Sequence, residues 1–141
     1  MADDRPENLR RRPLLTALIV LLALEAALML AAVGWLGLAL LTQPAASLPS
    51  AVAIVVIAII GALWVIVALI GAVRRHPWMR ALAITWQVIQ LAVAIGCFQG
   101  LTAEPAIGWA LLVPSVIGIL LLISPQVTHA LRGPDAGGPG A

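Results

Sequence analysis

The segment from Leu14 to Ser124 is almost free of charge, and this feature constrains the fold more than any other. Its charged residues are Glu25, Arg74, Arg75, Arg80 and Glu104. The whole chain is 62% hydrophobic and 10% charged, with a mean hydropathy of +1.09, whereas soluble domains carry about 25% charged residues. The composition therefore predicts an integral membrane protein.

Four apolar runs lie within this segment, over residues 14–41, 51–73, 78–100 and 105–123. Each has at least the ~18 residues that a helix needs to cross a ~30 Å hydrocarbon core. We therefore predict an all-α fold, an integral membrane four-helix bundle made of two hairpins. The predicted organisation is a basic cytoplasmic flank at 1–12, a four-transmembrane-helix domain at 13–123 and a partly disordered cytoplasmic tail at 124–141.

Helix breakers mark the connections between the runs. Pro44 and Pro49 lie in a charge-free loop after the first run, and residues 74–77, with the sequence Arg-Arg-His-Pro, form a basic turn after the second. After the fourth run, Ser124 and Pro125 are typical of a cap. They predict a further short turn before the Gly/Pro-rich tail.

The distribution of arginine sets the orientation. All eight arginines lie in the N-terminal flank, the 74–80 turn or the C-terminal flank, and the two alternate loops hold none. Basic residues favour the cytoplasmic side of a membrane. The sequence thus predicts a multi-pass protein of the cytoplasmic (inner) membrane with both termini inside. The topology-setting residues are Arg10, Arg11, Arg12, Arg74, Arg75, Arg80 and Arg132.

Polar residues of different runs converge on one depth. Glu25 is the only acidic residue inside any run, and a rise of about 1.5 Å per residue from Leu14 places it roughly 16 Å deep. The same count from Trp78 places Gln87 and Gln90 about 14 and 18 Å deep. Ser115 falls at a similar level in the fourth run. We therefore predict an intramembrane polar cluster of Glu25, Gln87, Gln90 and Ser115.

Two interpretations of this cluster are open. In the structural one, Glu25 is protonated and hydrogen-bonds Gln87 or Gln90, which specifies how the helices pack. In the functional one, Glu25 exchanges a proton at the midplane and serves a small transporter. No Arg, Lys, His or Asp lies at the depth of Glu25 to complete a proton relay, so the structural interpretation is favoured.

Small residues mark faces for close helix packing. They recur through the second and fourth runs, and the third run places Ala83, Gln87, Gln90 and Ala94 on one stripe. The first run carries two stripes on nearly opposite sides. One contains Leu18, Leu22, Glu25, Met29 and Ala32, and the other contains Ala23, Ala27, Ala31 and Gly34. A helix in a four-helix bundle normally has one covered side. Two opposed stripes therefore indicate that the first helix also contacts a protein chain outside the monomer.

No motif for an enzyme, cofactor or metal is present in the sequence. His76 and His129 both face the cytoplasm, but two ligands do not define a metal site. Ser115 has no histidine at its depth to activate it as a nucleophile. A sequence pI near 10 does not indicate nucleic-acid binding, because the arginines flank apolar runs instead of lining an aromatic face. The lone Cys97 cannot form an intramolecular disulfide.

Two resemblances add to this interpretation. Residues 75–80, Arg-His-Pro-Trp-Met-Arg, and 85–91, Thr-Trp-Gln-Val-Ile-Gln-Leu, resemble small four-span membrane proteins of actinobacteria that have no assigned function. This resemblance implies membrane location and topology and transfers no site. The chain is also similar to the small multidrug resistance family in placing a carboxylate, Glu25, in the first helix.

The sequence thus predicts a non-enzymatic membrane protein, a structural or accessory component of a larger membrane assembly. Its expected partners are the lipid bilayer and either further copies of itself or a larger membrane complex. The alternative is a minimal proton-coupled small-molecule transporter that uses the intramembrane Glu25.

Overall fold

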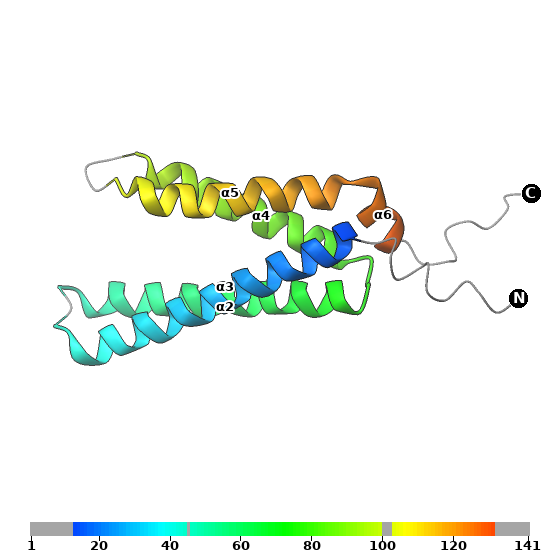
Figure 1. Cartoon of the computed structure of the whole chain (residues 1–141). Helices are drawn as coiled ribbons and strands as arrows, with labels where there is room; N and C mark the ends of the chain where they lie inside the picture. Colours follow the sequence, from blue (N-terminus) through cyan, green and yellow to red (C-terminus); the bar gives the residue numbers. More distant parts are fainter. Residues whose placement is uncertain (1–12, 45, 100–102, 132–141) are drawn as a thin grey trace, which may run out of the picture.

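The computed structural model describes residues 13–44, 46–99 and 103–131. These residues form an all-helical fold with the elements α2 (Pro13–Thr42), α3 (Leu48–Val73), α4 (Met79–Cys97), α5 (Pro105–Ile123) and α6 (Pro125–Leu131) (Figure 1). The first four of them are long and apolar enough to cross a membrane. The predicted basic flank at 1–12 and most of the predicted tail, with Arg10, Arg11, Arg12 and Arg132, lie outside the described residues.

Two helix boundaries differ from the prediction. Helix α3 begins at Leu48 and not at residue 51, because Pro49 falls in the first turn, where a proline needs no donor and does not break a helix. Helix α4 ends at Cys97 and not at residue 100. There the carbonyl of Cys97 accepts a hydrogen bond from the backbone N–H of Glu104 at 2.9 Å, across the loop.

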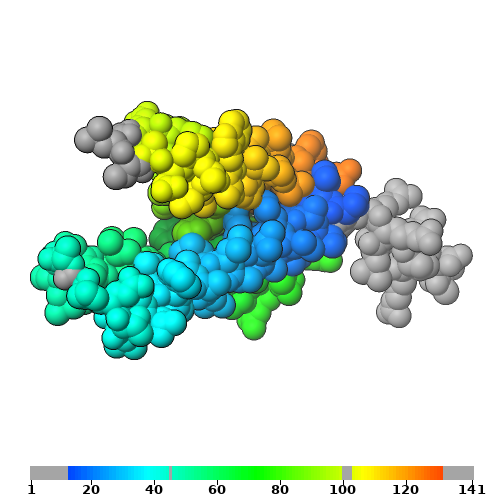
Figure 2. Space-filling model, turned by 60° about the vertical axis from the view of Figure 1, so that its left-hand side comes forward, coloured from blue at the N-terminus to red at the C-terminus, as the bar shows by residue number. Residues whose placement is uncertain are grey.

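The helices form two antiparallel hairpins, α2 with α3 and α4 with α5. The hairpins lie close together at the end where α6 lies and diverge toward the opposite end (Figures 1 and 2). Burial follows this shape. The buried residues of α2 lie between Leu15 and Ala26, and those of α3 lie between Ala62 and Ala72. The outer halves of α2 and α3 are therefore largely exposed.

The hydrophobic core sits at the α6 end. It joins residues of all five described helices, among them Leu18, Leu22, Val65, Met79, Leu122 and Val127. The predicted short turn after the fourth run is present as α6, and the Ser124 hydroxyl accepts a hydrogen bond from the backbone N–H of Val127 at 3.4 Å. At the same end, Arg80 Nε donates to the carbonyl of Leu122 at 3.2 Å, which offsets the unpaired carbonyls at the end of α5.

The turn between α3 and α4 joins the two hairpins. The backbone N–H of His76 donates to the carbonyl of Gly71 at 2.9 Å, and that of Arg75 donates to Ala72 at 3.1 Å. Arg75 has a φ of 56°, so the turn is a Schellman motif with a non-glycine residue in the left-handed position. This motif stops α3 and places Arg74, Arg75 and His76 on the surface.

Candidate functional site

A buried hydrogen-bonded group surrounds Glu25. The Glu25 side chain is 4% exposed. Its Oε2 accepts a hydrogen bond from Trp86 Nε1 at 3.1 Å, and Gln87 Nε2 lies 3.1 and 3.0 Å from Oε1 and Oε2. The predicted bond between Glu25 and an amide of the third long helix is therefore present, and its partner is Gln87.

Glycines on two other helices shape the space for these donors. A Cβ added to Gly118 of α5 would lie 2.6 Å from Cδ of Gln87, so the amide packs directly on the α5 backbone. A Cβ added to Gly61 of α3 would lie 3.3 Å from the Trp86 ring. All four long helices thus contribute to one site, in which α2 supplies the carboxyl group and α4 supplies the donors.

Gln90 and Ser115 belong to a second, adjacent group. Gln90 Nε2 and the Ser115 hydroxyl both donate to the carbonyl of Leu111, at 3.4 and 2.7 Å. The bond from Ser115 to Leu111, four residues earlier in α5, holds the hydroxyl group against its own helix. The predicted cluster of Glu25, Gln87, Gln90 and Ser115 is thus two groups joined through the buried face of α4, because that face is shared by α2 and α5.

Among the described residues, two buried side-chain acceptors lack a hydrogen bond. They are Oε1 of Gln87 and Oε1 of Gln90, whose residues are 0% and 8% exposed. A rotation of the Gln87 amide would present Nε2 to one Glu25 oxygen and Oε1 to the other. This is the paired arrangement that a protonated carboxyl group, both donor and acceptor, makes with an amide. In the observed orientation, Trp86 and Gln87 both donate to the Glu25 carboxyl group.

Trp86 is the hydrogen-bond donor of this site that the sequence analysis missed. It is half-buried, and a buried indole N–H generally needs an acceptor. Its position next to Gln87 places its ring about 100° around α4, between Glu25 and Gly61. The available signal was a tryptophan next to a glutamine within an apolar run.

The remaining candidates do not form a site. Among the described residues, no group of three or more His, Cys, Asp or Glu side chains could hold a metal ion. His76 and His129 are both exposed. Cys97 is a half-buried free thiol. The predicted topology residues Arg74 and Arg75 are exposed in the α3–α4 turn.

The structure defines an all-helical protein with four apolar helices long enough to span a membrane and a buried carboxyl group among them. No family model, curated protein or solved structure matches the chain. The resemblance to actinobacterial four-span proteins stays a prediction.

Proposed function

We propose that this chain is a non-enzymatic integral protein of the cytoplasmic membrane that serves as a structural or accessory component of a larger membrane assembly. One observation carries the proposal. The stripe of Ala23, Ala27, Ala31 and Gly34 is fully on the exposed side of α2, and an added Cβ at Gly34 would meet nothing within 4 Å. Small residues favour close helix approach, and here none of the described helices makes that approach.

The shape of the molecule supports the same proposal. The outer halves of α2 and α3 stand apart from the α4–α5 hairpin (Figure 2). On the opposite stripe of α2, Leu18, Leu22 and Glu25 are buried. Met29 is half-buried and Ala32 is exposed, so this stripe is covered only in its first part. The two stripes therefore have different roles, and the Ala23 to Gly34 stripe is available to a further copy or a partner helix.

Ala27→Leu tests this assignment. We expect it to reduce assembly markedly, because a larger side chain at the centre of the stripe holds the approaching helix away. The matched control is Ala92→Leu, on an exposed position of α4. The mass of the purified assembly in mild detergent, measured by light scattering, reports the effect. Equal masses for the two variants would mean that the stripe has no role in assembly.

The proposed topology places both termini and the α3–α4 turn in the cytoplasm. In a Cys97→Ala background, we expect Ser47→Cys to react with an impermeant thiol probe added outside intact cells, and His129→Cys to react only after lysis. The reason is the distribution of arginine between alternate connections. Both positions are exposed, so reversed labelling would overturn the orientation.

The alternative of a proton-coupled transporter is favoured by the buried carboxyl group of Glu25, which lies next to Ala26, the last buried residue of α2. Glu25→Gln separates the two functions, because an amide can replace a neutral carboxyl group in hydrogen bonding but cannot carry a proton. We expect Glu25→Gln to keep the mass of the assembly, and vesicles with either protein to be equally tight to protons. Proton entry with the wild type that is lost in Glu25→Gln, followed by an entrapped pH-sensitive dye, would replace our proposal with the transporter.

A further inference from the structure

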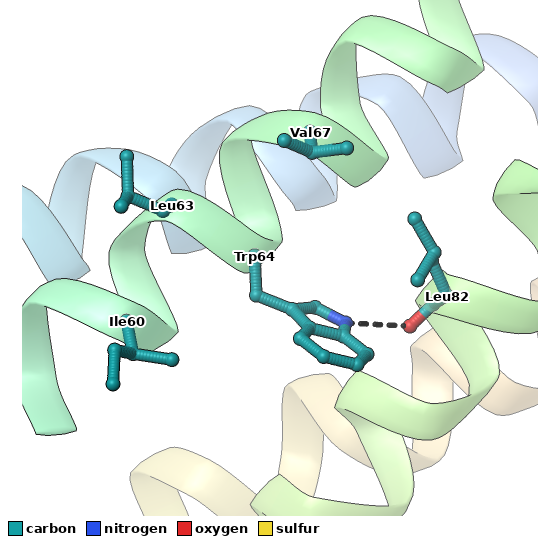
Figure 3. Close-up of a pocket in the computed structure, with 5 residues that line it drawn as sticks. All are labelled: Ile60, Leu63, Trp64, Val67 and Leu82. Atoms are coloured by element: carbon teal, nitrogen blue, oxygen red, sulfur yellow. Dashed lines mark hydrogen bonds between the residues drawn. The ribbon is translucent and has the colours of Figure 1, made fainter.

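An apolar groove lies on the outer surface between α3 and α4. It has a volume of about 260 Å³ and is lined by Ile60, Leu63, Trp64, Val67 and Leu82 (Figure 3). The indole N–H of Trp64 donates to the carbonyl of Leu82 at 3.1 Å. This bond fixes the Trp64 ring as a wall of the groove and occupies the only polar atom of that ring, the indole nitrogen. The lining therefore offers only apolar surface.

A basic turn lies beyond one end of this groove. Arg74, Arg75 and His76 are exposed there. Within the described residues, the carboxylates are those of Glu25, which is buried, and Glu104, which lies in the α4–α5 loop at the opposite end of the molecule. The described part of the chain thus supplies no anion to the Arg74 and Arg75 guanidinium groups.

The groove and the basic turn are connected by apolar surface. Trp78 is half exposed, and its ring lies against Gly71, where an added Cβ would be 3.3 Å from Cη2. Gly71 is one turn of α3 beyond Val67. A rise of about 1.5 Å per residue puts Val67 roughly 10 Å and Ile60 roughly 21 Å from Arg74 along the helix. One leaflet of hydrocarbon is about 15 Å thick, half of the core, so an acyl chain anchored at Arg74 reaches the groove.

We propose that the basic turn and the groove together form a binding site for one anionic phospholipid of the cytoplasmic leaflet. Arg74 and Arg75 bind the phosphate, since the planar guanidinium group matches phosphate oxygens. The Trp78 ring lies at the headgroup level, where tryptophan is favoured, and one acyl chain lies in the groove against Trp64 and Val67. Charge complementarity selects the anionic lipid, and the inference rests on the proposed membrane insertion.

The test uses the full chain, purified in mild detergent and titrated with phospholipid while native mass spectrometry counts bound molecules. Phosphatidylglycerol and phosphatidylethanolamine with identical acyl chains are compared. We expect tighter binding of phosphatidylglycerol and a loss of about fivefold for each of Arg74→Gln and Arg75→Gln. Glycerol phosphate, the soluble headgroup, should not displace the bound lipid, because it lacks the acyl chain.

A second pair of variants tests the groove. Val67→Trp fills it and should weaken binding of phosphatidylglycerol several-fold, whereas Val113→Trp, on an exposed position of α5, should not. Equal binding of the two lipids, or no effect of the arginine variants, would overturn the site. Equal behaviour of Val67→Trp and Val113→Trp would overturn the acyl-chain part. If the thiol labelling shows insertion while these results fail, only the lipid site falls; if labelling also fails, the membrane proposal falls with it.

Discussion

Gly71→Ala should destabilise the protein by about 1–3 kcal/mol, the range for overpacking a filled site. A Cβ at position 71 would lie 2.6 Å from Cβ of Met79, which is itself fully buried. Both atoms are fixed to helix backbones, so neither can rotate away, and α3 and α4 must separate at the joint between the two hairpins. Intrinsic helix propensity acts in the opposite direction, because alanine is favoured over glycine by about 1 kcal/mol.

The matched control for this prediction is Gly96→Ala. Gly96 also lies within a helix, but an added Cβ there would meet nothing within 4 Å. We expect Gly96→Ala to be neutral or stabilising by up to about 1 kcal/mol. Unfolding by a denaturing detergent in mixed micelles measures both variants against the wild type. If Gly71→Ala were as stable as Gly96→Ala, the close contact between Gly71 and Met79 at the joint of the two hairpins would be contradicted.

Gln87→Leu should destabilise the protein by about 1–3 kcal/mol, because it leaves the buried oxygens of Glu25 with one donor, Trp86. Replacing both partners of a buried hydrogen bond by apolar groups can be nearly neutral. The double variant Glu25→Leu/Gln87→Leu should therefore lose less stability than the sum of the losses of the two single variants, and the difference is the coupling energy. Hydrogen bonds between membrane helices average about 0.6 kcal/mol, so the coupling within this cycle should be of that order or somewhat larger.

The same unfolding measurement on four proteins, the wild type, two single variants and the double variant, gives the coupling energy. Gln99→Leu serves as a control, since Gln99 is exposed in the α4–α5 loop. Strictly additive losses would show that Glu25 and Gln87 do not interact in the folded protein, and the site described above would then be incorrect.

Both predictions depend on glycines that face larger side chains on a neighbouring helix. Gly61, Gly71 and Gly118 do more than let helices approach one another. Their missing side chains leave the space that Trp86, Met79 and Gln87 fill. The small residues and the buried polar or bulky residues are thus paired across helices, which explains why a chain so rich in small side chains still builds a defined site around Glu25.

The sequence by itself determined the number of long helices, their approximate bounds and much of their buried faces. Hydropathy and helical period are local properties, so the apolar runs and the stripe of Ala83, Gln87, Gln90 and Ala94 could be predicted, and all four of these residues are buried. The exposed stripe around Ala27 followed in the same way, from its position opposite Leu22. Membrane insertion and orientation rest on the same sequence features and stay predictions.

Only the tertiary structure decided which residues meet. Gln87 and Gln90 lie at nearly the same depth as Glu25, so their positions along α4 do not show which of them binds it. The choice of Gln87, the second donor Trp86 and the divergence of the two hairpins depend on how the helices rotate and cross. Those angles are set by contacts between distant residues, such as Gly118 with Gln87 and Gly71 with Met79, and no local pattern in the sequence records them.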